Sequence, residues 1–234
     1  MPNTIDDLLE RALTIPIGAR SLQADLVVPT GARGIVMFAH GSGSSRKSPR
    51  NRAVASALRH AHFATLLLDL LTLEEELVDV ETRHLRFDIP LLATRLEAAA
   101  VWIAQDPRTR ALPIGFFGAS TGAAAALAAA ARLGSTVHAI VSRGGRPDLA
   151  GHALEEVKAP TLLIVGGYDE PVLDLNRDAL ARLRCVKAMK IVPRASHLFE
   201  ERGAMEQVTQ MACAWFDQYL ARHEPGIAHS GAGW

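Results

Sequence analysis

The sequence has no surplus of charge of either sign, because its 234 residues include 25 basic and 25 acidic side chains. Without a positive surplus, there is no electrostatic reason to expect nucleic acid or an anionic membrane surface as a partner. Cysteine is scarce as well: Cys185 and Cys213 lie in apolar surroundings and show no repeated spacing. We therefore expect both to be reduced core residues rather than parts of a disulfide framework or a metal site.

Long apolar segments are also missing. The first ten residues carry three acids and lack the apolar centre of a secretory signal, and the alanine run 123–131 is too short to cross a bilayer. We therefore expect a cytoplasmic protein without membrane contacts. The composition, 49% hydrophobic and 21% charged, is ordinary for a globular chain and predicts one domain over residues 1–222 with a flexible tail at 223–234.

Short apolar segments that are typical of strands alternate with segments of helical periodicity. The strand patterns cover 13–17, 21–28, 34–39, 63–68, 112–117, 137–141, 161–165 and 186–192. The helical patterns cover 49–61, 91–105, 123–133, 171–183 and 205–220. The first two strands resemble a hairpin turning at Gly18 and Ala19, and the later alternation predicts an α/β fold with a doubly wound, parallel sheet.

The segment 71–89 interrupts this alternation. It is acidic in its first half, basic at Arg83 and Arg86, and follows the end of an expected central strand. Ligands bind at that edge of an α/β sheet, so the segment is either a lid over a site or an ordinary solvated loop with a short helix.

Ser120 lies in the segment Gly-Ala-Ser-Thr-Gly at 118–122, between an apolar strand pattern and an alanine-rich helical pattern. A serine at such a sharp strand-to-helix turn points its hydroxyl out above the sheet edge, and flanking glycines remove the Cβ atoms that would clash. The helix N-terminus that follows also favours negative charge there. Ser120 is therefore the candidate nucleophile.

A serine hydroxyl needs a neighbouring base, and the base needs an orienting carboxylate. His197 follows the last expected strand and precedes the last helix, so it lies at the same sheet edge as Ser120 and is the candidate base. Asp169, which follows a strand and glycines that let the chain bend, is the candidate acid. The acids that compete for this role, or that cap the next helix, are Asp148, Glu170 and Asp174.

Negative charge on an attacked carbonyl oxygen is stabilised by fixed backbone N–H donors. We assign this oxyanion hole to the amides of Ser42 and Thr121, with Gly43 as the alternative to Ser42. His40, just before these residues, is interpreted as a structural loop histidine rather than a second base. The other histidines show no metal-ligand spacing, and we expect neither a metal nor a cofactor.

Two groups of basic side chains have no role in this scheme. Arg143 and Arg146 flank two glycines at the end of an expected strand, where solvation at the surface explains them and contact with an anionic substrate group is the alternative. The other group consists of Arg46, Lys47, Arg50 and Arg52. We expect it on a solvated loop and helix face rather than on a surface that binds phosphate groups.

The four segments His40-Gly41, Gly118–Gly122, Gly167–Asp169 and Ala195–Phe199 together resemble the α/β-hydrolase superfamily, and within it the small, nearly capless enzymes similar to dienelactone hydrolase. The resemblance runs from Leu13 to Leu220. It implies a mostly parallel sheet of roughly eight strands with helices on both faces, a minimal cap, a Ser-Asp-His triad and hydrolysis of esters or related acyl compounds. Dienelactone hydrolases use a cysteine nucleophile, whereas this chain has Ser120, so we expect a general carboxylesterase rather than activity on dienelactone.

The sequence therefore predicts a serine hydrolase that cleaves small or medium esters or lactones through an acyl-enzyme, as a monomer or homodimer. Two other functions stay open: acyl transfer or peracid formation on the same triad, and a non-catalytic binding protein. The segment 41–48 resembles phosphate-binding loops, but Arg46 stands where both nucleotide-binding motifs need glycine.

Overall fold

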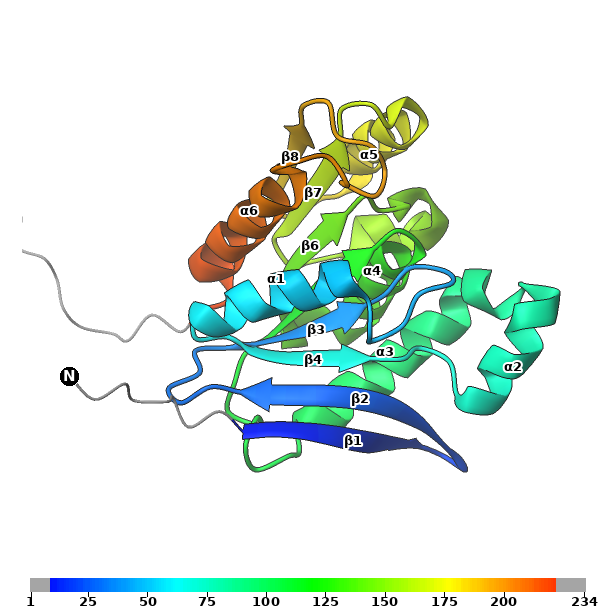
Figure 1. The fold of residues 1–234 in the computed structure, drawn as a ribbon, viewed down its shortest axis with the longest axis vertical. Helices are drawn as coiled ribbons and strands as arrows, with labels where there is room; N and C mark the ends of the chain where they lie inside the picture. Colours follow the sequence, from blue (N-terminus) through cyan, green and yellow to red (C-terminus); the bar gives the residue numbers. More distant parts are fainter. Residues whose placement is uncertain (1–8, 222–234) are drawn as a thin grey trace, which may run out of the picture.

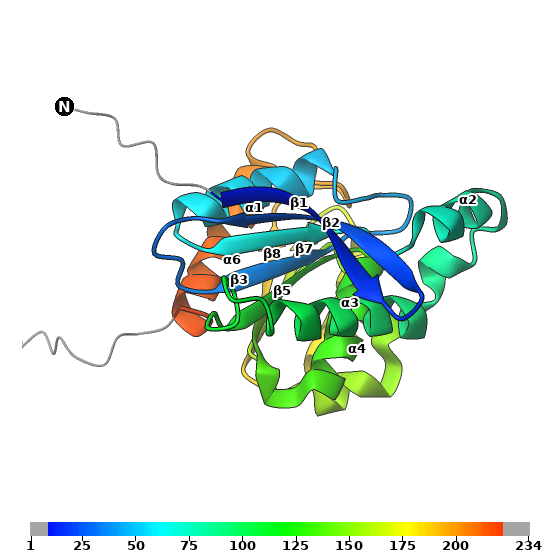
Figure 2. The same ribbon diagram turned by 90° about the horizontal axis from the view of Figure 1, so that it is seen from below.

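A twisted sheet of eight strands forms the centre of the computed structural model, which describes residues 9–221 (Figures 1 and 2). The strands are β1 (Leu9–Ile17), β2 (Arg20–Val28), β3 (Ile35–Ala39), β4 (Ala64–Leu68), β5 (Ile114–Ala119), β6 (Val137–Arg143), β7 (Thr161–Gly166) and β8 (Lys187–Val192). Their order is β1-β2-β4-β3-β5-β6-β7-β8; β2 runs antiparallel to both of its neighbours, β1 and β4, and the other pairs of these strands are parallel. The expected tail at 223–234 lies outside the described residues.

Six helices accompany these strands within the described part of the chain, and the last of them follows β8. They are α1 (Pro49–His60), α2 (Leu73–Thr82), α3 (Ile89–Ile103), α4 (Thr121–Leu133), α5 (Glu170–Arg182) and α6 (Ala204–Tyr219). Shorter 3-10 segments are η1 (Leu85–Phe87), η2 (Gly134–Thr136) and η3 (Pro147–Glu156). The predicted hairpin, helices and parallel strands are confirmed with small shifts at their ends, and α2 with η1 accounts for the segment that interrupted the pattern.

The sheet is covered on both faces, which is why its central strands are continuously apolar rather than alternating. Every residue of β3, β4 and β5 is buried. Met37 and Phe116 point toward α3 and α4, whereas Phe38 and Phe117 point toward α1 and α6. The last two rings pack with their centroids 5.0 Å apart. Figure 1 shows α1 and α6 in front of the sheet and α3 and α4 behind it.

Helix α4 follows the candidate nucleophile and is a core helix. Its residues from Thr121 to Ala130 are all buried, and most are alanine. Alanine is the best helix former, and its small side chain allows a helix to approach a sheet closely. The alanine run therefore lets α4 pack closely against the sheet, against α3 and against η3, and fixes the position where the helix begins. In the described part of the chain, no helix has the length and apolarity needed to span a membrane.

The loops that follow the parallel strands all lie at one edge of the sheet, the carboxyl edge. The strand order reverses direction at β3 and β5, because β4 lies beyond β3 on one side and β6 lies beyond β5 on the other. Ligands bind in α/β sheets at such a switch point. Helix α2 projects from the same edge, beyond the tips of β3 and β4 (Figure 1).

Candidate active site

Ser120 occupies the turn between β5 and α4 in a backbone conformation that L-residues avoid. Its φ is 51° and its ψ is −123°. The carbonyl oxygen of Ser120 accepts hydrogen bonds from the amides of Ala123 and Arg146, each at 3.1 Å, and its own amide donates to the carbonyl of Arg143 at 3.3 Å. These contacts hold the strained turn, and the Ser120 side chain remains partly exposed at the sheet edge.

The glycines around Ser120 are required by close approach of the backbone. A Cβ at Gly118 would lie 2.4 Å from Ala123 Cα, and a Cβ at Gly122 would lie 2.2 Å from the carbonyl oxygen of Ala39. The prediction that these two positions leave no room for a Cβ is therefore confirmed. Gly41 packs directly on the serine, since a Cβ there would lie 3.0 Å from Ser120 Cβ.

His197 and Asp169 are brought together by the loops that follow β8 and β7. Nδ1 of His197 lies 2.6 Å from Oδ2 of Asp169. The Asp169 side chain is 12% exposed and the His197 side chain 39% exposed, so the carboxylate is enclosed while the ring reaches solvent. When Nδ1 carries the proton, it donates to the carboxylate and leaves Nε2 free as an acceptor.

Two glycines allow the His197 loop to lie against its neighbours. A Cβ at Gly166 would lie 2.4 Å from the carbonyl oxygen of Ala195, and one at Gly144 would lie 3.1 Å from that of His197. Gly166 has no positive φ, so its role is close packing and not the sharp bend expected from the sequence. Gly144 follows Arg143, whose carbonyl binds the Ser120 amide, so Ser120 and His197 flank the same strand end. In residues 9–221, no direct hydrogen bond joins these two side chains.

The competing acids have other partners or positions. Both oxygens of Asp148 accept from Arg146, at 2.9 and 2.8 Å. Asp174 accepts from Arg177 at 2.7 Å, and Glu170 is exposed in the first turn of α5. Of the four acids considered from the sequence, the structure pairs Asp169 with His197.

The two residues proposed for the oxyanion hole are in contact with each other. The Ser42 amide donates to the hydroxyl oxygen of Thr121 at 2.9 Å. Thr121 is the first residue of α4, where backbone amides have no partner within the helix. Gly43, the alternative to Ser42, is exposed and has a φ of +69°. The sequence analysis did not foresee that the Thr121 hydroxyl holds the Ser42 amide.

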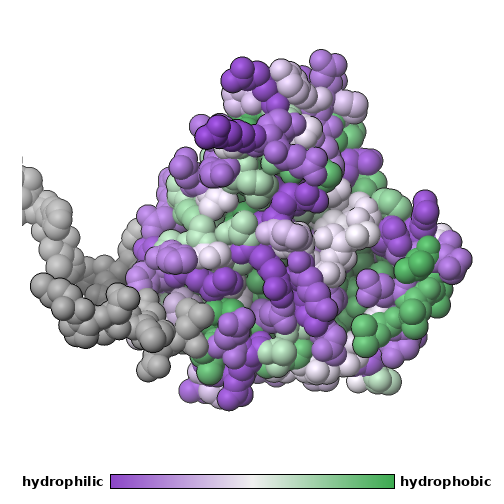
Figure 3. Space-filling model, in the orientation of Figure 1, coloured by the Kyte–Doolittle hydropathy of each residue, from purple (hydrophilic) through white to green (hydrophobic). Residues whose placement is uncertain are grey.

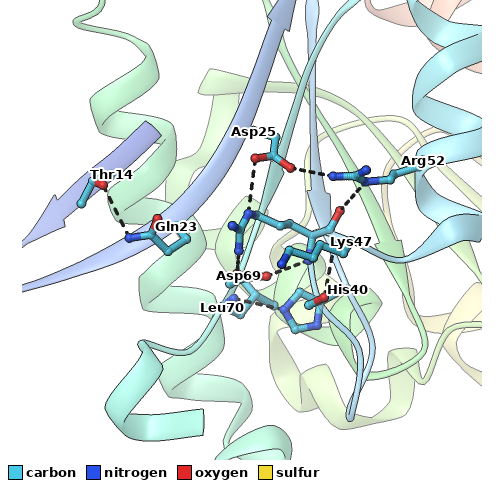
Figure 4. Close-up of polar contacts among 10 residues, drawn as sticks. Thr14, Gln23, Asp25, His40, Lys47, Arg52, Asp69 and Leu70 are labelled. Carbon is cyan, nitrogen blue, oxygen red and sulfur yellow. Dashed lines mark hydrogen bonds and ion pairs between the residues drawn. The ribbon is translucent and has the colours of Figure 1, made fainter. Parts of the chain in front are cut away.

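His40 connects the loop after β3 to the loop after β4. Its Nδ1 lies 2.9 Å from the carbonyl oxygen of Gly41, and its Nε2 accepts from the Leu70 amide at 3.1 Å (Figure 4). Burial lowers the pKa of His40 below its ordinary value of 6.5. A neutral ring with both nitrogens engaged fits the structural role predicted for this residue.

Ion pairs hold the same loop from its other end. The Arg46 amide donates to Asp69 at 2.7 Å, and its guanidinium pairs with both Asp69 and Asp25. Asp25 also accepts from Arg52 at 3.0 Å. The expectation that this basic group is only a solvated surface is therefore wrong for Arg46, whose side chain is 19% exposed. A charge pattern in the sequence does not reveal partners that lie on other strands.

A cavity of about 320 Å³ opens beside the loop 40–44. Its walls come from that loop, from the chain after β4, from α2 and from Thr121, and the lining includes Leu70, Leu71, Val80, Arg86 and Leu92. The segment 71–89 is therefore one wall of the cavity. Figure 3 shows apolar surface over α2, where Leu73, Leu77, Val78 and Val80 are more than half exposed.

The arginines at the end of β6 differ in their surroundings. Arg146 is half-buried and pairs with Asp148. Arg143 is only 8% exposed, so solvation at the surface does not explain it.

Eight strands in this order, the strained serine turn and the His-Asp pair define an α/β-hydrolase fold. The solved dienelactone hydrolase of Anabaena variabilis is 60% identical to the chain, with a TM-score of 0.90, and the match covers 91% of this chain and 99% of that one. The chain therefore belongs to the dienelactone hydrolase family, a family of hydrolases. The esterase Est1E of Butyrivibrio proteoclasticus, at 15% identity and a TM-score of 0.74 over 88% of this chain and 98% of its own, shares the fold.

Two curated sequences from strains of Mycobacterium tuberculosis, provisionally named phosphoribosyl transferases, are 53% identical over 218 residues. The match covers 93% of this chain and 48% of theirs, so the chain spans about half the length of these relatives. No protein-family model matches the chain.

Proposed function

We propose that the chain is a serine hydrolase that cleaves small or medium carboxylic esters or lactones through an acyl-enzyme. The observation that carries this proposal is the 2.6 Å contact between His197 and Asp169, at the same sheet edge as the strained Ser120. A base oriented by a carboxylate, at the same sheet edge as a partly exposed serine, provides the groups that acyl transfer to serine requires.

In the proposed reaction, Nε2 of His197 takes the proton of the Ser120 hydroxyl while Oγ attacks the carbonyl carbon. The bond between Oγ and carbon forms, and the carbonyl oxygen becomes negatively charged. The imidazolium, stabilised by Asp169, then gives its proton to the leaving alkoxide as the ester bond breaks. A water molecule, deprotonated by the same histidine, releases the acid and restores Ser120.

The oxyanion formed in this step would be bound by the amides of Ser42 and Thr121. The Thr121 hydroxyl already accepts from the Ser42 amide, which supports the view that this amide points toward the site. A substrate oxygen would replace the hydroxyl as acceptor. Removal of one such donor typically costs about 10²–10³ in kcat.

The size of the cavity beside α2 supports a substrate with a small or medium acyl group. Its volume of about 320 Å³ is at the lower end of ligand cavities. Apolar side chains from Leu70, Leu71 and Leu92 line it together with charged groups from α2 and η1. We assign the acyl group to this cavity, and short or medium chains fit its size.

A cysteine nucleophile, as in dienelactone hydrolases, has no support in this chain. Cys185 and Cys213 are free and half-buried, and burial raises the pKa of both thiols. A thiol with a raised pKa is a poor nucleophile at neutral pH. Ser120 occupies the turn where the nucleophile is expected, which favours ester hydrolysis over activity on dienelactone.

Acyl transfer to an acceptor other than water would use the same three residues, and so would peracid formation. A non-catalytic binding protein would have no need for an oriented base. The name of the Mycobacterium tuberculosis relatives refers to chains about twice as long as the shared part.

The test is turnover of p-nitrophenyl acetate by the Ser120→Ala variant. We expect kcat/KM to fall by about 10⁴-fold or more, because the acyl-enzyme cannot form. Ser135→Ala, at an exposed position in η2, is the matched control and retains activity. Unchanged turnover by a folded Ser120→Ala variant would remove Ser120 from the mechanism.

A further inference from the structure

Two arginines lie near each other at the carboxyl edge of the sheet, on the face that α1 and α6 cover, because Arg143 contacts Phe199 and Arg50 pairs with the next residue, Glu200. Arg143 is the last residue of β6. Its side chain lies on the same face of the strand as those of Ala139 and Val141, which pack in the core beneath these helices. The ring of Phe199 lies on one side of Arg143, with its centroid 6.0 Å from Cζ. Arg50, in the first turn of α1, is the other cation of this site, which we call the Arg143–Arg50 site.

Three guanidinium nitrogens of this site are buried without acceptors. Nε and Nη1 of Arg143 are inaccessible to solvent and make no hydrogen bond within the described residues, and the same holds for Nε of Arg50. Glu200 is the acid that pairs with Arg50, at 3.5 Å, and its side chain is 65% exposed. An exposed ion pair of this length contributes little, so the buried donors stay unsatisfied.

Among the described residues, Arg143 has no acidic partner, and Arg50 has only the exposed Glu200. Burial, reinforced by the positive charge of Arg50, lowers the pKa of Arg143 to about 10. With a pKa of about 10, Arg143 remains a cation at neutral pH, and a buried charge without a partner is strongly unfavourable. Guanidinium groups present rigid donors that match the oxygens of carboxylate and phosphate, so an anion would satisfy donors and charge together.

We propose that Arg143 and Arg50 bind an oxyanion, a phosphate or carboxylate group, at a site that none of the residues of the proposed triad forms. Glu200 occupies the Arg50 side of this site, and the ligand enters by replacing it. The site adjoins the triad, because the Arg143 carbonyl accepts the Ser120 amide and Phe199 is two residues from His197. The ligand is therefore a small anion, or a larger molecule whose anionic group rests beside the hydrolase site.

The test is a titration of the full chain with inorganic phosphate and, separately, with acetate. Sodium chloride at equal ionic strength controls for screening, and binding is measured by thermal shift and by calorimetry. We expect phosphate or acetate to raise Tm beyond the chloride control. Stabilisation by phosphate alone assigns the site to phosphate groups, and stabilisation by both assigns it to oxyanions in general.

Variants then locate the binding. Arg143→Gln and Arg50→Gln are expected to weaken it by about tenfold or more, because each removes a charge-assisted donor group. Arg177→Gln, an exposed arginine on α5 that makes the same change in net charge, should leave it unchanged. Glu200→Gln should strengthen binding, since the competing carboxylate is removed.

Two results would overturn the proposal. One is the absence of any stabilisation by phosphate or acetate beyond chloride. The other is equal binding by wild type and by Arg50→Gln, a partly exposed position whose substitution leaves the core intact even if Arg143→Gln fails to fold. Neither result depends on ester hydrolysis, so failure here leaves the proposed triad to its own test.

Discussion

The residues at the carboxyl edge derive their proposed chemistry from the backbone that holds them. A non-glycine residue at a φ of 51° costs about 1–3 kcal/mol, and Ser120 keeps this conformation because its carbonyl and amide are both hydrogen-bonded. His197 is oriented by a largely enclosed carboxylate. Strain and orientation are therefore maintained by the fold before any substrate binds.

Asp169 and Asp148 can be separated by paired substitutions. Asp169→Asn should lower kcat by about 10³–10⁴-fold, because an amide stabilises neither the required tautomer of His197 nor its protonated form. Asp148→Asn should have little effect, since Asp148 pairs with Arg146. Steady-state kinetics with p-nitrophenyl acetate measure both variants, and a larger loss in the Asp148 variant would reverse the assignment.

The lowered pKa of His40 predicts how the stability of the folded chain depends on pH. Its pKa in the folded chain lies below the ordinary value of 6.5, so the unfolded chain takes up the proton first as the pH falls. The contribution of neutral His40 to the free energy of unfolding is therefore complete above about pH 6.5. It is lost as the pH falls below that value toward the pKa of His40 in the folded chain.

The measurement is Tm at about pH 8 and about pH 5, for wild type and His40→Gln. A glutamine oxygen accepts from the Leu70 amide without titrating, so the drop in Tm toward acid should be a few degrees smaller in this variant. His152→Gln, at an exposed position in η3, is the control. Equal drops in wild type and His40→Gln would contradict the role assigned to His40.

For helix α2, the sequence contains the local signal of a helix start but not the position of the helix in the fold. Its capping box, Thr72 with Glu75, is a local pattern, but the acidic character of the segment left a lid and a solvated loop equally open. The position of α2 as a cavity wall depends on Leu92 of α3 and on the loop 40–44, which are distant in sequence. Long-range contacts of this kind leave no periodic pattern in the chain.

Val80 of α2 tests the proposed acyl cavity. It lines the cavity and is 59% exposed, so a larger side chain there should narrow the cavity without disturbing the core. Val80→Trp should lower kcat/KM for p-nitrophenyl hexanoate by about tenfold and change acetate turnover by less than about twofold. Leu77→Trp, on the same helix but 74% exposed and outside the lining, is the control. An equal effect on both esters would place the acyl group elsewhere.

For the whole molecule, the sequence predicted the architecture and the edge that carries the site. Alternating strands and helices imply a parallel sheet, and residues that follow parallel strands share one edge, so Ser120, Asp169 and His197 could be grouped before any coordinates. Partners across the fold could not be predicted. The Arg46 ion pairs join Asp25 of β2 and Asp69 after β4, whereas Arg143 is buried at the end of β6 against Phe199. A count of charges contains no such information.

The most direct test of the central claim is the mass of the purified chain after reaction with a fluorophosphonate, followed by peptide mapping. We expect one covalent adduct, located on Ser120 and absent from Ser120→Ala. An adduct on another side chain, or no adduct on protein that still hydrolyses esters, would contradict it.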